Sequence, residues 1–348
     1  MAVGLADRFE DRTAALRLGL ALLGVAAFAL LPQVLSNFET GLVVEFLILL
    51  LFAASYDLLI GFTGVVSFGH ALPYGVGAYF MGIAMSGRPL PGIPEAGLSL
   101  PVAVVLALVA VVLVSLITGW LAFQLSGVYF AMLTLAFSMV GYFVVFESTG
   151  ITGGDNGLLV FRPDLLGLPL GDYVTFYYLV FWVVLVSFLA MRRLTNSPFG
   201  RVLVCIRENE ERARFLGYDT FRYKLGVFVV AGLFAGIAGL LQGLYLQIVT
   251  PDLLYWSTGG DALLVTLIGG MGTLWGAAVG AAFLLGAREL LTGIVEGWPI
   301  VLGVVYVLFV LFVPHGIAGL LTGKGEARSV WDVVGDLRSD DGEGSTDD

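Results

Sequence analysis

Charge, cysteine and histidine are all scarce in this sequence. Only 13% of its 348 residues are charged, against about 25% in an average soluble domain, and 58% are hydrophobic. A chain with so little charge cannot cover a water-facing surface, so lipid is the expected solvent. The single cysteine, Cys205, excludes an internal disulfide. With only two histidines beside it, a dedicated His/Cys metal site is not expected.

Motifs for catalysis and nucleotide binding are also missing from the sequence. No Gly-x-x-x-x-Gly-Lys-Ser/Thr pattern occurs, so the chain is not expected to cradle the phosphates of ATP. We find no nucleophile–base pair, metal-ligand cluster or paired carboxylates at usable spacing. The chain is therefore not expected to be an enzyme or to carry a cofactor.

Long hydrophobic runs are abundant instead. A helix needs about 20 apolar residues to cross about 30 Å of hydrocarbon. We therefore expect an all-α, polytopic transmembrane bundle over residues 16–321, with about 10 spans and a range of 8–10. The candidate spans are Leu16–Leu35, Leu42–Ile60, Ala71–Met85, Leu100–Leu121, Val128–Phe146, Tyr173–Leu189, Leu225–Ile248, Ala262–Leu274, Gly276–Leu291 and Ile300–Leu320.

The first of these runs has a second interpretation. Arg8 and Arg12 precede it and Arg17 lies at its start, as in a secretory signal peptide. However, Leu35-Ser36-Asn37 is a poor cleavage site, and many more runs follow. A retained first helix is therefore preferred.

Basic residues predict the orientation. Residues 192–224 contain eight of the 17 Lys and Arg residues, and inserting a charge costs about 2.5–3.5 kcal/mol at the bilayer centre. This segment is therefore expected in the cytoplasm, together with the N-terminal segment 1–15 and the C-terminal tail 322–348. The tail ends in an acidic stretch, Asp336 to Asp348, that cannot bury apolar area and is expected to be disordered.

Two of the runs are interrupted by glycine in corresponding parts of the two halves of the chain. One is entered through Gly61-Phe62-Thr63-Gly64, and the other surrounds Gly269-Gly270-Met271-Gly272. Paired broken helices suggest two pseudo-repeated halves and a substrate path, because unwound backbone offers polar groups at membrane depth. The other interpretation, that these glycines only allow close helix packing, stays open.

The basic segment itself has the pattern of a short helix outside the membrane. Ser197-Pro198 ends the preceding helix and suits the start of another. Residues 208–216 are helix formers of mixed charge, with Ala213 and Leu216 on one face, and Gly217 fits a C-cap. Such a helix would suit docking to a cytoplasmic partner. Composition alone favours a merely solvated loop.

Several motifs of the chain resemble those of the branched-chain amino acid ABC transporter permeases, specifically the LivM type. They occur in family order from about residue 50 to 320 and are specific jointly, although each is weak alone. The matching stretches are Gly61–Gly64, Ser67–His70, Gly75–Tyr79, Gly127–Ala131, Thr134–Phe137, Thr152–Leu158, Ser197–Arg201, Ile206–Asn209, Ala213, Leu216-Gly217, Arg222–Lys224, Ile268–Thr273, Trp275-Gly276 and Pro314–Gly316.

The resemblance implies a type II ABC importer-like fold in the cell membrane, with both termini cytoplasmic. It implies a second homologous permease, two ATPase subunits that hold ATP and Mg, an extracytoplasmic binding protein and surrounding lipid as partners, and no nucleic acid. Residues 192–224 would form the coupling loop. The implied coupling residues are Arg207, Glu208, Asn209, Glu210, Ala213, Leu216 and Gly217; the translocation path would use Gly61, Thr63, Gly64, Ser67, Gly69, Thr134, Gly269, Gly270, Gly272 and Thr273; and the external loop would be Thr152, Gly153, Gly154, Asn156 and Gly157.

Other substrates and another transport class remain open. Related permeases carry urea, short amides or sugars. A secondary transporter that runs without ATP would need coupling-ion residues, for which Glu45 and Asp57 are the early candidates. The family usually has Asn where Asp57 stands, and we expect Asp57 near the cytoplasmic surface and hydrated. The sharper alternative is a polar group that faces the path or the partner permease.

The remaining ionisable residues in or beside the runs are expected to have minor roles. Arg288 and Glu289 lie near the end of the ninth run and are expected at the membrane interface. His70 and His315 stand beside glycines, and for both a structural role is preferred to a proton relay.

Overall fold

The computed structural model describes residues 24–25, 28–86, 99–165, 168–293, 297–313 and 316–321. The predicted N-terminal segment, half of the first run, and the acidic tail lie outside the described residues. His315 also lies outside them.

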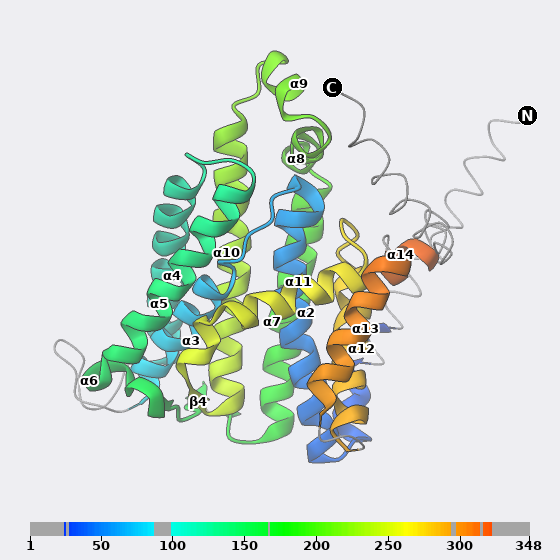
Figure 1. The fold of residues 1–348 in the computed structure, drawn as a ribbon. Helices are drawn as coiled ribbons and strands as arrows, with labels where there is room; N and C mark the ends of the chain where they lie inside the picture. The colour runs from blue at the N-terminus through cyan, green and yellow to red at the C-terminus, as the bar shows by residue number, and fades with distance from the viewer. Residues whose placement is uncertain are drawn as a thin grey trace, which may run out of the picture.

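Helices dominate the described residues and pack side by side in a bundle (Figure 1). The elements are η1 (Leu31–Gln33), α2 (Asn37–Thr63), α3 (Ala71–Met85), α4 (Leu100–Ala122), α5 (Val128–Glu147), α6 (Thr149–Thr152), η2 (Gly154–Asn156), β1 (Leu158–Leu159), β2 (Asp164–Leu165), β3 (Leu168–Pro169), α7 (Tyr173–Thr195), α8 (Pro198–Glu208), α9 (Glu210–Phe215), α10 (Thr220–Leu246), β4 (Ile248–Val249), η3 (Pro251–Leu254), α11 (Trp256–Gly269), α12 (Gly276–Thr292), α13 (Trp298–Phe312) and α14 (Gly316–Leu321).

Five of these helices, α2, α4, α5, α7 and α10, are long and apolar enough to cross a membrane. The helix α3 and part of α13 are shorter apolar segments. The expected all-α membrane bundle is therefore confirmed in this coarse form. The count of about ten spans and the pseudo-repeat stay predictions.

The helix α2 lies at the centre of the bundle. Its apolar residues surround the whole helix, the pattern of a helix buried on all sides. It packs against α7, α10, α11 and α12. Ser36 begins it with a capping box to Glu39, and Gly64 ends it at φ 72° in the left-handed conformation.

Glycine allows α3 and α10 to pack with their backbones in contact. A Cβ on Gly77 would collide with the carbonyl oxygen of Gly236, and one on Gly239 with that of Tyr74. Small residues permit this close approach between membrane helices, where dispersion forces supply much of the packing energy. Glycine at positions 77 and 239 is therefore required for the close packing of α3 on α10.

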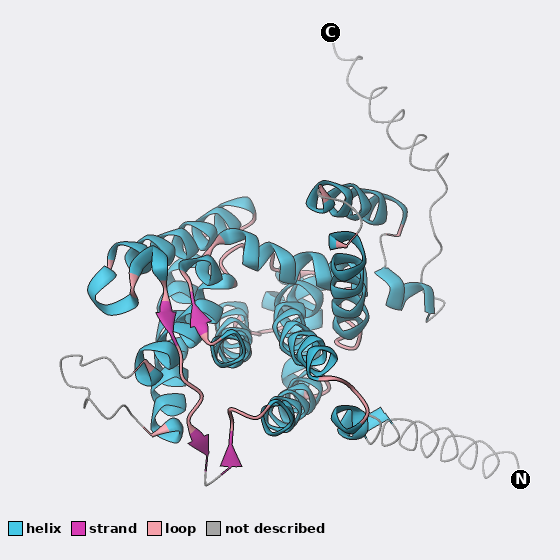
Figure 2. Cartoon of the chain, turned by 90° about the horizontal axis from the view of Figure 1, so that it is seen from below, coloured by secondary structure: helices cyan, strands magenta, loops and turns pink. Residues whose placement is uncertain are grey.

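The two ends of the bundle differ. The helices α8 and α9 stand at one end, at the top of Figure 1. At the other end, seen from below in Figure 2, β1 pairs with β4 and β2 with β3 in short antiparallel ladders. Arg162 fastens this end by donating hydrogen bonds to the carbonyls of Leu244 (2.7 Å) and Tyr245 (2.8 Å) in the last turn of α10.

Candidate transport site

The chain re-enters the bundle before α11. After β4, residues 250–255 run inward, and Ser138, near the middle of α5, donates a 2.7 Å hydrogen bond to the carbonyl of Leu254. The side chain of Leu254 packs beside Gly75 and Gly141, from α3 and α5. The 14-residue α11 therefore begins at mid-depth in the bundle. The N–H of Thr258 in its first turn donates to the carbonyl of Tyr255 at 3.1 Å, and the start of a helix carries partial positive charge.

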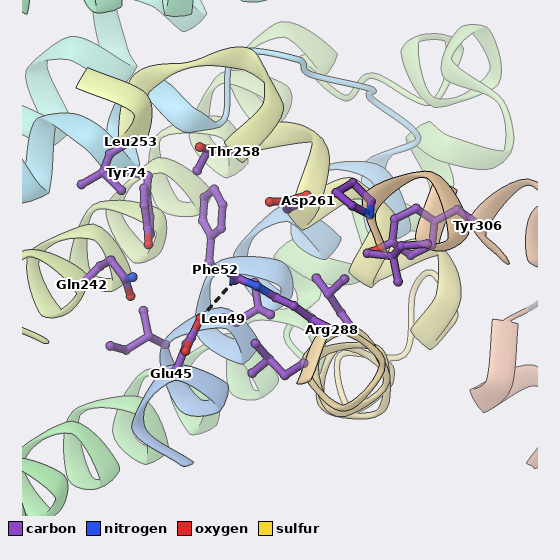
Figure 3. A pocket seen from close by; sticks show the side chains of 15 residues that line it. Glu45, Leu49, Phe52, Tyr74, Gln242, Leu253, Thr258, Asp261, Arg288 and Tyr306 are labelled. Atoms are coloured by element: carbon purple, nitrogen blue, oxygen red, sulfur yellow. Dashed lines mark hydrogen bonds and ion pairs between the residues drawn. The ribbon is translucent and has the colours of Figure 1, made fainter. Parts of the chain in front are cut away.

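A groove of about 430 Å³ opens beside the start of α11 (Figure 3). We call it the charged groove, because Glu45 from α2, Asp261 from α11 and Arg288 from α12 line it. Arg288 is ion-paired to Glu45 at 3.4 Å. The remaining walls combine polar side chains with aliphatic ones: Tyr74, Gln242, Thr258 and Tyr306 among the first, Ile48, Leu284 and Leu302 among the second.

Part of this groove was not predicted from the sequence. Glu45 and Arg288 were noticed separately, but Asp261, Gln242 and Tyr306 were not. A carboxylate beside Gly259 and Gly260, at the edge of an apolar run, was the signal that could have identified Asp261.

A second cluster joins the two glycine-broken segments. The Asp57 carboxylate on α2 accepts hydrogen bonds from the backbone N–H of Gly272 (2.7 Å) and of Leu274 (3.0 Å). Asp57 is only 1% exposed, so the expectation that it is hydrated is wrong. The 270–275 loop covers it, and two N–H donors replace the water that an ionised carboxylate needs.

The basic segment reaches the same cluster through Arg207. Its guanidinium donates to the carbonyl of Gly61 and forms a 2.7 Å ion pair with Glu208. A Cβ on Gly61 would collide with Asp57 and with the backbone nitrogen of Gly272. Glycine is therefore required at position 61 for this close approach.

The other predicted path residues fall into smaller groups. Thr134 accepts a 3.2 Å hydrogen bond from the N–H of Phe68, and its backbone lies against Gly69, with Ser67 buried beside them. Gly269 packs on Gly276, and Thr273 donates to the carbonyl of Gly270 at 2.8 Å.

A further groove of about 740 Å³ lies at the α8 end. Thr63 and Gly64 line it together with Arg207, Glu208 and other residues. The role of all these path residues in transport stays a prediction.

The basic segment folds largely as its pattern indicated. Ser197 caps α8 and Pro198 opens it. Asn209 caps α9 by accepting a 2.8 Å hydrogen bond from the N–H of Arg212, and Gly217 follows at φ 89°. The observed helix α9, Glu210–Phe215, is shorter than the predicted range 208–216.

The two residues expected on one apolar face of this helix lie in different surroundings. Ala213 is buried against Val202 and Ile206, whereas Leu216 is 69% exposed. The exposed apolar neighbour of Leu216 is Phe215, at 87%. The reason is that α9 ends at Phe215. Ala213 faces α8, whereas Phe215 and the cap residue Leu216 are exposed on the outer side.

Glu210 holds α9 to the start of α10. Its carboxylate accepts hydrogen bonds from Lys224 (2.7 Å), Arg214 (2.8 Å) and Thr220 (3.1 Å). Partial burial raises the pKa of Glu210, but the hydrogen bonds and the charge of Lys224 outweigh it, so the pKa is lowered overall.

The predicted external loop is a set of tight turns. Thr152 donates to the carbonyls of Val145 (2.6 Å) and Ser148 (2.8 Å). Gly153, Gly154 and Gly157 all have positive φ, and Asn156 ends the short η2 helix between them. These residues shape the loop that places β1 against β4.

The surroundings of His70 fit the structural role that was expected for it. It is buried, lies 2.9 Å from the Ser55 hydroxyl through its Nε2, and stacks on Phe52.

A multi-pass bundle with a helix that starts at mid-depth, charged groups in a groove beside it, and a folded basic segment at one end defines a membrane transport subunit. The chain belongs to the family described as branched-chain amino acid transport system / permease component, which it matches over residues 39–313. This family consists of transport permeases rather than enzymes.

The curated relatives agree. The chain is 28% identical to the high-affinity branched-chain amino acid transport system permease protein LivM of Escherichia coli K12, over 82% of this chain and 71% of that protein. It is 26% identical to the probable LivM of Methanocaldococcus jannaschii, over 65% and 73% of the two chains. LivH of Salmonella typhimurium is 25% identical, over 77% of this chain and 90% of LivH. No solved structure matches the chain.

Proposed function

We propose that this chain is the LivM-type permease subunit of an ATP-driven importer of branched-chain amino acids in the plasma membrane. It pairs with a LivH-type permease, two ATPase subunits drive it from the cytoplasm, and an extracytoplasmic binding protein delivers the substrate. The observation that carries this proposal is the folded segment α8–α9, which presents Phe215 and Leu216 outward at one end of the bundle.

In this proposal the segment α8–α9 is the coupling element. ATP binding closes the ATPase subunits and moves α9, while Glu210 keeps α9 joined to α10. Arg207 passes the movement to Gly61 at the end of α2, and Asp57 passes it to the 270–275 loop. ATP can bias the permease only by binding its two states with different affinity.

Copurification of the assembled complex tests the coupling role. The double variant Phe215→Ser/Leu216→Ser should lose the ATPase subunits while keeping the second permease, because exposed apolar anchors at an interface supply much of the binding energy. Phe161→Ser is the matched control: its side chain is 65% exposed, and it lies at the opposite end. Equal recovery of ATPase with both variants would reject this role for α9.

Uptake separates this proposal from the alternatives. Removing the cognate ATPase should abolish leucine uptake; uptake that survives would favour a secondary transporter. The ligand bound by the binding protein distinguishes branched-chain amino acids from urea, amides or sugars.

Cys205 tests the proposed orientation. It is exposed on α8, so an impermeant thiol reagent should label it only from the cytoplasmic side. Labelling only from outside would reject the orientation.

A further inference from the structure

We infer that the charged groove is the place where this chain meets the charged end of an amino-acid substrate during translocation. The inference rests on the proposed function and adds the residues and the chemistry of one contact. The groove brings together three ionisable side chains, Glu45, Asp261 and Arg288, from three helices. They lie beside the start of α11 at mid-depth in the bundle (Figure 3).

The depth of the groove is the first argument. The 27 residues of α2 are about 40 Å long, and Glu45 lies about 12 Å from its first residue. A hydrocarbon layer of about 30 Å centred on this helix therefore includes Glu45 and its ion-pair partner Arg288.

The exposure of these charges is the second argument. The side chains of Glu45 and Arg288 are 29% and 55% exposed. Partly exposed charges at this depth are costly against lipid and belong to water-filled paths or protein interfaces. The charged groove therefore faces water or the partner permease rather than acyl chains.

The arrangement of charge matches a zwitterion. Glu45, Asp261 and Arg288 together carry one net negative charge when ionised. The two carboxylates can receive an ammonium group. Arg288 can receive a carboxylate, and the positive end of the α11 dipole beside the groove favours an anionic group there.

The remaining walls suit an aliphatic side chain. Ile48, Leu284 and Leu302 line the same groove as the three charges. Its volume of about 430 Å³ is within the range of about 300–1,000 Å³ usual for small-molecule sites. Tyr306 also lines the groove. Its buried hydroxyl has no hydrogen-bond partner among the described residues.

A purely structural ion pair is the competing explanation. In that case Glu45 and Arg288 would only clamp α2 to α12, and Asp261 would matter little. Asp261 lies outside this pair, on α11, which makes its charge the more discriminating target.

The first test uses the complete transporter in proteoliposomes, with the loaded binding protein outside and ATP inside. The measured quantity is leucine transported per ATP hydrolysed. Asp261→Asn should lower it by about 10-fold or more, the effect of losing one hydrogen bond to a charged group, while stimulated ATP hydrolysis continues. Glu289→Gln, next to Arg288 and exposed but outside the groove, is the matched control and should leave the ratio unchanged. Equal ratios for the two variants would overturn the inference.

The second test separates substrate contact from clamping. The exchange Glu45→Arg/Arg288→Glu keeps an ion pair between α2 and α12 but reverses the positions of the charges. Assembly should be retained, while the amount of leucine transported per ATP should be lower than in the natural complex. A ratio equal to that of the natural complex would show that only the ion pair between α2 and α12 matters, and would reject the substrate contact.

A third measurement does not depend on the identity of the substrate. In a Cys205→Ser background, Thr258→Cys places the sole thiol in the groove wall. An impermeant methanethiosulfonate reagent should modify it in the assembled complex, and absence of modification in every nucleotide state would reject a water-facing groove. If the unaltered complex takes up no leucine, the proposed function fails. If it does take up leucine and Asp261→Asn is harmless, only the present inference fails.

Discussion

Asp57 and Gly272, 215 positions apart in the sequence, are joined by a 2.7 Å hydrogen bond from the backbone N–H of Gly272 to the Asp57 carboxylate. The bond connects the central helix α2 to the loop between α11 and α12. Since Arg207 from α8 donates to Gly61 one turn further along α2, three distant parts of the chain meet at this point. A movement of the basic segment therefore has a direct mechanical connection to the broken-helix region.

Asp57→Asn should destabilise this junction. The carboxylate accepts from two backbone N–H groups, at Gly272 and Leu274, whereas one amide oxygen has to replace two carboxylate oxygens. Leaving one buried donor unsatisfied costs about 1–3 kcal/mol. Thermal unfolding of the purified protein in detergent should show a lower midpoint. The exposed Asp164→Asn is the control, and equal midpoints for both variants would mean that Asp57 is solvated after all.

Arg207 should be needed for coupling more than for assembly. Arg207→Gln removes both the hydrogen bond to Gly61 and the ion pair with Glu208, so ATP hydrolysis should continue while leucine uptake falls by about 10-fold or more. Arg207→Lys keeps the charge but not the planar fork that makes both contacts, and should give an intermediate value. Uptake and hydrolysis measured in parallel check the prediction; a proportional fall of both in the two variants would contradict it.

Gly239→Ala should damage the contact between α3 and α10. The added methyl group collides with the backbone carbonyl of Tyr74, and overpacking of this kind costs about 1–3 kcal/mol. Gly286→Ala, in α12 with no atom within 4 Å of its Cβ position, is the matched control and should be neutral or slightly stabilising. Detergent-resistance and thermal-unfolding measurements should therefore separate the two variants. Equal stability would mean that the helices can move apart at no cost.

Glu210 should stabilise α9 in a pH-dependent way. Its pKa in the folded protein is lower than the ordinary 4.5, so the stabilisation is complete above that pH and is lost as the pH falls through the lowered value. Glu210→Gln should accelerate limited proteolysis within residues 198–220 at pH 7. An acid-active protease at low pH should find a smaller difference between the variant and the natural chain.

Glu211→Gln serves as the control for this experiment. Glu211 is an exposed neighbour on the same helix, and its substitution should leave the rate of proteolysis unchanged. A rate increase with Glu211→Gln as large as that with Glu210→Gln would point to a general charge effect instead.

Local features of this protein were predictable from the sequence because their causes are local. Long apolar runs indicated membrane helices, since hydrocarbon thickness sets the length of a span. Ser197 and Pro198 predicted the start of α8, and Gly217 the end of α9, because caps and fixed backbone angles act within one turn. The order of short motifs indicated the permease family, which the match over residues 39–313 confirms.

The tertiary structure alone decided which polar groups meet. Asp57 looked like a residue near a surface, yet Gly272 and Leu274 cover it. Arg288 pairs with Glu45, 243 positions away, and nothing in the sequence indicated this partner. The periodicity of a helix specifies which residues share its face but not which other helix that face contacts. In a bundle where nearly every face is apolar, the partner is chosen by shape and by the few buried charges, and neither can be read from one helix at a time.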